Sequence, residues 1–259
     1  MKFNKKIAFT LAEVLITLGI IGVVAALTIP ALIHNHQKKV LESQFKKSVS
    51  TVSQFIQRAK FDSGIEKFGA FCTEFDGSEY SNKNECYKYL NKASFGIDSN
   101  NRYEPIKRNQ TIIKTYNSKN TIISNSLGIY SYGIIFTANL PDGSYLCYNI
   151  NELELGIIID TNGANGPNKY GHDIFYLRLD KNKDIVIARM PGKAYTDEEL
   201  DTMYPPDSSF SDSMAKNRIG YPCNLTSTQK GNGIGCAYYA LMDECPYDST
   251  KSYFECLPR

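Results

Sequence analysis

The chain has 259 residues, of which 42% are hydrophobic and 22% are charged, enough for one well-buried domain with appendages. Its 29 basic residues nearly balance 27 acidic ones and form no long block, which argues against binding of nucleic acid through overall charge. The seven cysteines include no C-x-x-C pair, and the three histidines are not at zinc-finger spacing, so we expect no zinc site.

An uncharged run of 20 residues, 14–33, stands near the N-terminus. As a helix it would be about 30 Å long, enough to cross the hydrocarbon core of a bilayer. A secretory signal peptide cut after the small residues 24–26 is one alternative, although the apolar run continues past them. A plain membrane anchor is another, but it leaves the lone carboxylate Glu13 unexplained.

A charge retained in a membrane helix usually has a partner. Cleavage between Ala8 and Phe9 would create one, because the new amine of Phe9 lies four residues from Glu13 and on the same helix face. Glu13 also lies in the first turn, where the helix dipole favours an anion. Between two copies, the amine of one chain could meet the carboxylate of the next.

Residues 5–33 resemble the prepilin-type N-terminal segment shared by type IV pilins and the pseudopilins of type II secretion. The matching features are a basic leader, the first residues after the cut, the glutamate and a proline 22 residues past the cut: Lys2, Lys5, Lys6, Phe9, Thr10, Leu11, Glu13 and Pro30. The residue before the cut is usually glycine in that family, and here it is Ala8.

The resemblance implies that a prepilin peptidase removes residues 1–8 and that Phe9 is then N-methylated. Residues 9–33 would hold the subunit in the inner (cytoplasmic) membrane by a single span, with the C-terminal domain extracytoplasmic. An inner-membrane assembly platform would build it, with other subunits, into a filament in the periplasm or at the cell surface. Glu13 would neutralise the amine of a neighbouring subunit, and Pro30 would kink the helix.

Residues 34–63 continue as an amphipathic helix. Apolar residues recur at steps of three and four, and the pattern stops near Gly64: Leu41, Phe45, Val49, Val52, Phe55 or Ile56, and Ala59. The whole helix would be nearly 80 Å long, and Pro30 should kink or locally melt it.

Residues 64–190 change to short apolar runs separated by turn signals, which predicts β structure. The expected strands are 111–116, 130–140, 144–150, 155–160, 174–180 and 184–190, joined as an antiparallel meander. Residues 72–110 read as a polar loop between helix and sheet. The predicted fold is therefore α+β and pilin-like, a long N-terminal helix packed on an antiparallel sheet.

The connection 160–173 is long and rich in Asn and Gly. Asp160, Asn162, Asn165 and Asp173 could supply oxygen ligands to calcium, although the loop lacks the closing Glu of an EF-hand. Similar loops occur in the calcium-binding region of major pseudopilins. The alternative is a wide glycine turn held by Asx hydrogen bonds.

Residues 191–259 form a Cys-rich C-terminal subdomain, with a short helix expected in residues 233–245. Scattered cysteines beyond a membrane segment suit an oxidising compartment, where three bridges could form and one thiol would remain. The candidates are Cys72, Cys86, Cys223, Cys236, Cys245 and Cys256. Only a bridge between Cys72 and Cys86 is suggested, and buried reduced thiols are the alternative.

No catalytic motif such as G-x-S-x-G or H-E-x-x-H occurs, and His172 and Asp173 are adjacent on the chain, so we do not expect an enzyme. Two functions of different classes remain. One is a structural subunit of a pilus or pseudopilus, and the other is a membrane-anchored extracytoplasmic binding or adhesive module that is not assembled into a filament.

Overall fold

The computed structural model describes residues 10–74, 81–96, 111–119, 121–124, 134–150, 155–163, 165–188, 191–192, 222–228 and 231–258. The chain divides into two compact units, Met1–Val40 and Leu41–Arg259. The predicted processing site, Ala8 and Phe9, lies outside the described residues.

Helix α1 spans Leu11–Ser63. It continues through Pro30, so of the two effects expected there, a kink or local melting, melting does not occur. It ends before Gly64, whose φ of +68° suits glycine at a helix C-terminus. Within the second unit its buried face is Phe45, Ser48, Val52, Ile56 and Ala59, which confirms the predicted amphipathic half.

Helix α2 spans Phe68–Thr73, and helix α3, Ser81–Phe95, lies within the region 72–110 that was predicted as a polar loop. That prediction was wrong for residues 81–95. The sequence hid helix α3 because its apolar face is narrow, Cys86, Tyr87, Leu90 and Ala93, and lies among Asn, Lys and Ser residues. The Cys72–Cys86 disulfide ties the two helices together.

The main sheet is a five-stranded antiparallel meander in the order β3-β4-β5-β6-β7, as predicted. Its strands are β3 Ile134–Asn139, β4 Tyr145–Ile150, β5 Leu155–Asp160, β6 Ile174–Leu179 and β7 Val186–Ala188. A second, two-stranded sheet pairs β1, Thr111–Lys114, with β2, Thr121–Ser124. Strand β2 was not among the predicted strands.

Both faces of the main sheet are covered. One face packs on α1, where the rings of Phe45 and Phe175 lie 4.3 Å apart between centroids. The opposite face carries Tyr145, Cys147, Ile158 and Tyr176 in a second apolar cluster. Every residue of β4 and β5 is buried, which explains why these strands show no clear alternation of apolar and polar residues.

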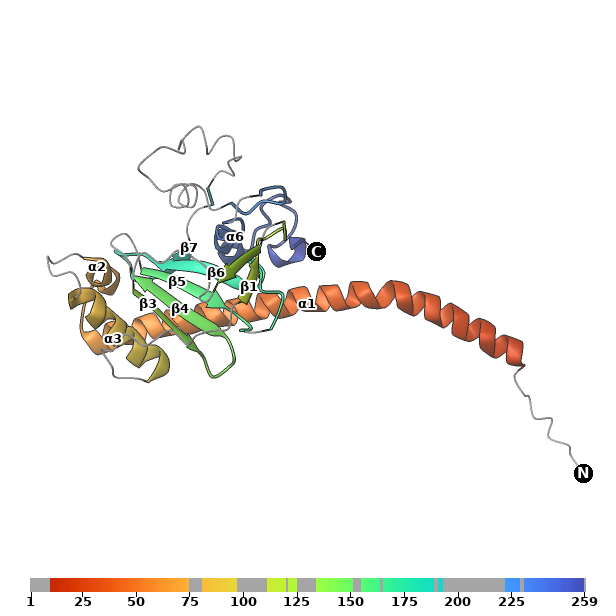
Figure 1. Ribbon diagram of the computed structural model, residues 1–259, viewed down its shortest axis with the longest axis horizontal. Coiled ribbons are helices and arrows are strands. Elements are labelled where there is room, and N and C mark those ends of the chain that lie inside the picture. The colour runs from red at the N-terminus through yellow and green to blue at the C-terminus, as the bar shows by residue number, and fades with distance from the viewer. Residues whose placement is uncertain are drawn as a thin grey trace, which may run out of the picture. The chain divides into compact units, whose positions relative to one another are not determined.

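The C-terminal part adds the short helix α6, Cys236–Met242, and the 3-10 helix η1, Phe254–Cys256. The short helix was predicted from the sequence. Figure 1 shows α6 and the C-terminus at one end of the sheet and α2 with α3 at the other end.

Candidate functional site

Glu13 lies in the first turn of α1 and is held by the residue that caps the helix. Thr10 donates to Glu13 Oε2 from both its backbone N–H and its hydroxyl, each at 2.8 Å. In return, the N–H of Glu13 donates to Thr10 Oγ1 at 3.3 Å. This Thr-x-x-Glu arrangement is a capping box, which satisfies backbone donors left unpaired at a helix start. Sequence reasoning missed it, although the spacing of Thr10 and Glu13 is its signal.

The apolar half of α1 exposes its large side chains. Leu11 is 81% exposed and Leu27 74% exposed, and the other large apolar residues up to Ile33 are also exposed. In the part of the chain that the structure describes, α1 is the one helix that is long and apolar enough to cross a membrane. A face of this kind needs an apolar environment, which a bilayer or other helices provide.

The polar groups within this apolar stretch are satisfied inside the helix. The hydroxyl of Thr17 donates to the carbonyl of Val14, and that of Thr28 donates to the carbonyl of Val24, each at 2.9 Å. Such local bonds lower the cost of a hydroxyl in lipid. Pro30 has no N–H to donate, so it removes one bond of the helical ladder.

Asp173, at the end of the loop 160–173, hydrogen-bonds to backbone N–H groups of the same loop. Its Oδ2 accepts the N–H of Asn168 and its Oδ1 accepts the N–H of Lys169, both at 2.7 Å. Burial raises the pKa of Asp173 to about 6, while these backbone hydrogen bonds act in the opposite direction. The carboxylate therefore stabilises the backbone of the loop, as in the alternative of a turn held by Asx hydrogen bonds.

The structure brings three of the four predicted calcium ligands together. Asp160 is fully buried, and its Oδ1 lies 3.4 Å from the N–H of Asn162. The Asn162 side chain also hydrogen-bonds Asp173. Asn165 is exposed, and its amide donates to the carbonyl of Asn162 at 3.1 Å, so it acts within the turn.

The remaining oxygens of this loop are of the kind that calcium takes. Thr161 Oγ1, Asn162 Oδ1 and Asn168 Oδ1 are buried and have no hydrogen-bond partner. Oxygen atoms of this kind, like the carboxylates of Asp160 and Asp173, are the ligands that a hard cation takes. Among the described residues no group of three or more His, Cys, Asp or Glu could hold a metal, so a calcium ion here would need neutral oxygens in addition to the two carboxylates. Thr161 and Asn168 were not among the predicted ligands.

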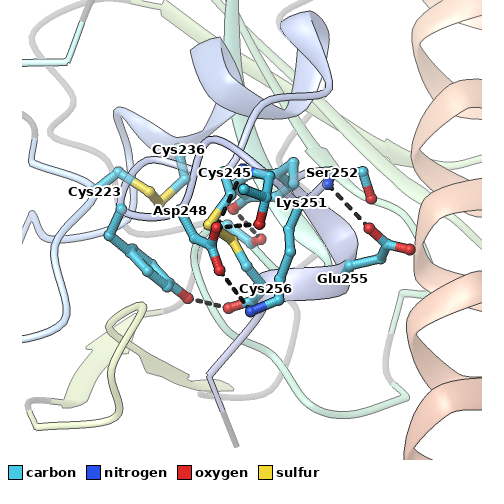
Figure 2. The surroundings of a disulfide bond; sticks show 12 residues. Cys223, Cys236, Cys245, Asp248, Lys251, Ser252, Glu255 and Cys256 are labelled. Atoms are coloured by element: carbon cyan, nitrogen blue, oxygen red, sulfur yellow. Dashed lines mark hydrogen bonds and ion pairs between the residues drawn. A yellow bond between two sulfur atoms is a disulfide. The ribbon is translucent and has the colours of Figure 1, made fainter.

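The C-terminal module, defined as residues 222–228 and 231–258, is held by two disulfides, Cys223–Cys236 and Cys245–Cys256 (Figure 2). Asp248 Oδ2 contacts Lys251 Nζ at 2.5 Å, and Asp248 Oδ1 accepts the hydroxyl of Thr250 at 2.6 Å. The Lys251 and Thr250 bonds lower the pKa of Asp248 to about 2. Cys147 is the free cysteine among the described residues, and burial raises the pKa of its thiol.

This module docks closely on the loop 160–173. The hydroxyl of Tyr253 donates to the carbonyl of Gly171 at 2.5 Å. A Cβ at Gly171, where φ is +77°, would lie 2.7 Å from Cys236 Cβ, so only glycine fits. A Cβ at Gly233 would likewise lie 2.5 Å from Tyr170 Cβ. The loop therefore provides the surface on which the C-terminal module packs, a role that its sequence did not indicate.

His172 is buried beside this contact. Its Nε2 lies 3.2 Å from the carbonyl oxygen of Tyr116, and the two rings lie 5.5 Å apart between centroids.

Comparison of the chain with models of protein families, with curated proteins and with solved structures found no match.

Proposed function

We propose that this chain is a prepilin-like structural subunit of a type IV pilus or of a type II secretion pseudopilus. In this proposal residues 1–8 are removed after Ala8, Phe9 is N-methylated, and the mature subunit is drawn from the membrane into a filament. The observation that carries the proposal is Glu13, a lone carboxylate in the first turn of an apolar helix whose large side chains are exposed.

The physical argument concerns the charge of Glu13 once the helix is packed among others. An isolated charge inside a bilayer costs about 2.5 to 3.5 kcal/mol, and less near the interface. The two hydrogen bonds from Thr10 spread this charge but do not neutralise it. The amine of a neighbouring Phe9 would neutralise it and so favour packing of one subunit against the next.

The rest of the chain supports this proposal in two ways. The amphipathic half of α1 packs on the sheet, and the apolar half precedes it in the chain, so one chain contains both a filament core helix and an outer domain. The three disulfides suit an oxidising compartment, in agreement with an extracytoplasmic location of that domain. A prepilin peptidase, an inner-membrane assembly platform, other subunits and lipid are the partners that the proposal requires.

A membrane-anchored binding or adhesive module is the second candidate, and the capping box favours it. Because Thr10 and Glu13 satisfy each other within one chain, Glu13 has a local role that needs no neighbouring subunit. The filament subunit therefore requires the charge of Glu13, whereas the anchored module requires only its hydrogen bonds.

The substitution Glu13→Gln separates them, because glutamine can keep the capping box but carries no charge. For a filament subunit, we expect normal membrane insertion and at least about a tenfold loss of chain recovered in sheared filaments. Mass spectrometry of the wild-type mature chain should find methylated Phe9 at its N-terminus. An intact Met1 would favour the anchored module, whereas normal assembly of the Gln variant would count against the pairing role of Glu13.

A further inference from the structure

Three Asn-Gly pairs occur in the chain, and the structure describes all of them: Asn162-Gly163, Asn165-Gly166 and Asn232-Gly233. Asparagine is a heat-labile side chain, and a glycine after it lacks the Cβ that would otherwise shield the next backbone nitrogen. Two pairs lie in the loop 160–173, and the third lies in the C-terminal module. Because the two-residue sequence is the same in all three, a difference in their reactivity must come from the fold.

Deamidation at such a pair begins within the chain. The backbone nitrogen of the glycine attacks Cγ of the asparagine, the bond from Cγ to Nδ2 breaks, and Nδ2 leaves as ammonia with the proton of the backbone N–H. Water then opens the cyclic succinimide at either carbonyl and gives an aspartyl or an isoaspartyl residue, the latter with one additional backbone carbon. The reaction therefore needs a glycine N–H without a hydrogen bond and an asparagine side chain that can turn toward it.

The fold protects Asn232. Its side chain is buried, with Oδ1 accepting the N–H of Asn224 at 3.0 Å and Nδ2 donating to the carbonyl of Asn224 at 2.9 Å. The N–H of Gly233 donates to the carbonyl of Pro222 at 2.7 Å. Both reacting groups are therefore held, and deamidation of Asn232 needs local opening of the C-terminal module.

The fold also restrains Asn162. Its Nδ2 donates to the carbonyl of Gly166 at 3.0 Å, and its Oδ1 is buried. Gly163 has a φ of +65°, and an added Cβ there would meet the carbonyl oxygen of Gly143, in the turn between β3 and β4. The backbone at Gly163 is therefore closely packed, and its nitrogen has little room to move toward the Asn162 side chain.

Asn165 is different from the other two. Its side chain is exposed, and its Nδ2 donates to the carbonyl of Asn162 at 3.1 Å at the surface. Among the described residues no group accepts the N–H of Gly166. An added Cβ at Gly166 would meet nothing within 4 Å, so the space around this peptide is open. The attacking nitrogen is therefore free, and the amide can turn toward it once an exposed hydrogen bond breaks.

We propose that Asn165 is a spontaneous deamidation site of the folded chain, modified by attack of the Gly166 nitrogen, while the other two pairs stay intact. The modification turns an exposed amide into a carboxylate, in a loop that already carries two carboxylates, and removes the donor to the Asn162 carbonyl. The contact of Gly171 with the C-terminal module lies outside this turn, so we expect the modified chain to stay folded. Because ammonia is lost, the change accumulates as the chain ages.

Incubation of the detergent-solubilised full-length chain at mildly alkaline pH, in water enriched in heavy oxygen, tests the proposal. Heavy oxygen enters position 165 when the succinimide opens during the incubation, which excludes deamidation during later digestion. Mass spectrometry with electron-transfer fragmentation assigns the oxygen to a residue and distinguishes aspartate from isoaspartate. We expect both products at position 165, at a rate at least about tenfold above that at Asn162 or Asn232, because those two need local opening.

Two controls separate the fold from the sequence. In guanidinium chloride with a reductant, all three pairs should react at similar rates, because the fold no longer distinguishes them. In Gly166→Ala the new Cβ lies in open space, so the fold is kept, but it hinders attack by the nitrogen of residue 166 and should slow the reaction at Asn165 severalfold.

Three results would overturn the proposal. One is equal incorporation of heavy oxygen at Asn165 and Asn232 in the folded chain, which would mean that the fold does not select the site. Another is aspartate without isoaspartate at position 165, which would indicate direct hydrolysis by water. The third is an unchanged rate in Gly166→Ala, which would mean that the backbone nitrogen is not the nucleophile.

Discussion

The apolar half of α1 and the C-terminal module are stabilised in opposite ways. Between residues 11 and 33 the large side chains are exposed, and the polar groups bond within their own helix. In the module, two disulfides and a close glycine contact hold short irregular segments against the sheet. The first region needs a surrounding medium or partner to bury its side chains, whereas the second obtains its order from cross-links and tertiary contacts.

This difference decides what a change in each region affects. A change in the apolar half should alter membrane insertion or assembly and leave the fold of the globular unit intact. A change in the module should alter the stability of the globular unit and leave membrane insertion intact. The predictions below test that separation through changes in the globular unit.

The largest effect should follow removal of the Cys223–Cys236 bridge. In the double variant Cys223→Ala, Cys236→Ala we expect the free energy of unfolding to fall by about 3 kcal/mol, because a short closed loop is released in the unfolded chain. Urea unfolding of the detergent-solubilised chain, followed by tyrosine fluorescence, measures it, since the chain has 18 Tyr and no Trp.

Cys147→Ala is the control for that variant, because Cys147 is buried but unbridged, and it should cost about 1 kcal/mol. Membrane insertion of the double variant should be unchanged. If insertion fails together with folding, the two regions do not act separately.

A smaller loss should follow Gly171→Ala. The new Cβ would meet Cys236 and the Tyr253 hydroxyl in a backbone conformation that alanine disfavours, at a cost of about 2 kcal/mol. The matched control is Gly143→Ala, because Gly143 has a φ of +86° but an added Cβ would meet nothing within 4 Å, and it should cost about 1 kcal/mol. Equal losses in urea unfolding would show that backbone strain, and not docking of the module, makes Gly171 necessary.

Sequence patterns predicted the regions whose order is local or periodic. The buried face of α1, with Phe45 and Val52, follows a helical repeat, and the strands β3 to β7 follow apolar runs between turn residues. Helix α3 was not predicted, because its narrow apolar face is hidden among polar residues. The packing of the C-terminal module on the loop at Gly171 was not predicted either. It depends on a contact between Gly171 and Cys236, which are 65 residues apart in the sequence.

Calcium should have a moderate effect if the oxygens of the loop 160–173 bind it. At a calcium concentration tenfold above Kd, we expect about 1.4 kcal/mol of added stability, since the ion would bind only the folded loop. Differential scanning calorimetry with and without calcium measures the shift, with magnesium as the control ion. Asp160→Asn should abolish the shift. If calcium leaves the melting temperature of the wild type unchanged, the loop does not bind calcium, and its role is only to provide the surface on which the module packs.

The smallest effect should come from the ion pair that joins α1 to the turn between β3 and β4. Asp142 Oδ2 lies 2.8 Å from Lys47 Nζ. Burial opposes ionisation of Asp142, but the Lys47 ammonium and the Ser144 hydrogen bonds lower its pKa to about 2. Because this lies below the unfolded value of about 3.9, the pair stabilises the fold above about pH 4 and is lost as the pH falls through about 2.

Asp142→Asn should therefore cost about 0.5 kcal/mol at pH 7, since the pair is largely exposed, and almost nothing near pH 2. Unfolding measured across this pH range for wild type and variant gives the difference. A gap between them that stays constant down to pH 2 would mean that the hydrogen bonds to Ser144, and not the charge, fix the turn. In either case the cost stays well below that of the bridge or of Gly171, because the turn that Asp142 fixes lies outside the module.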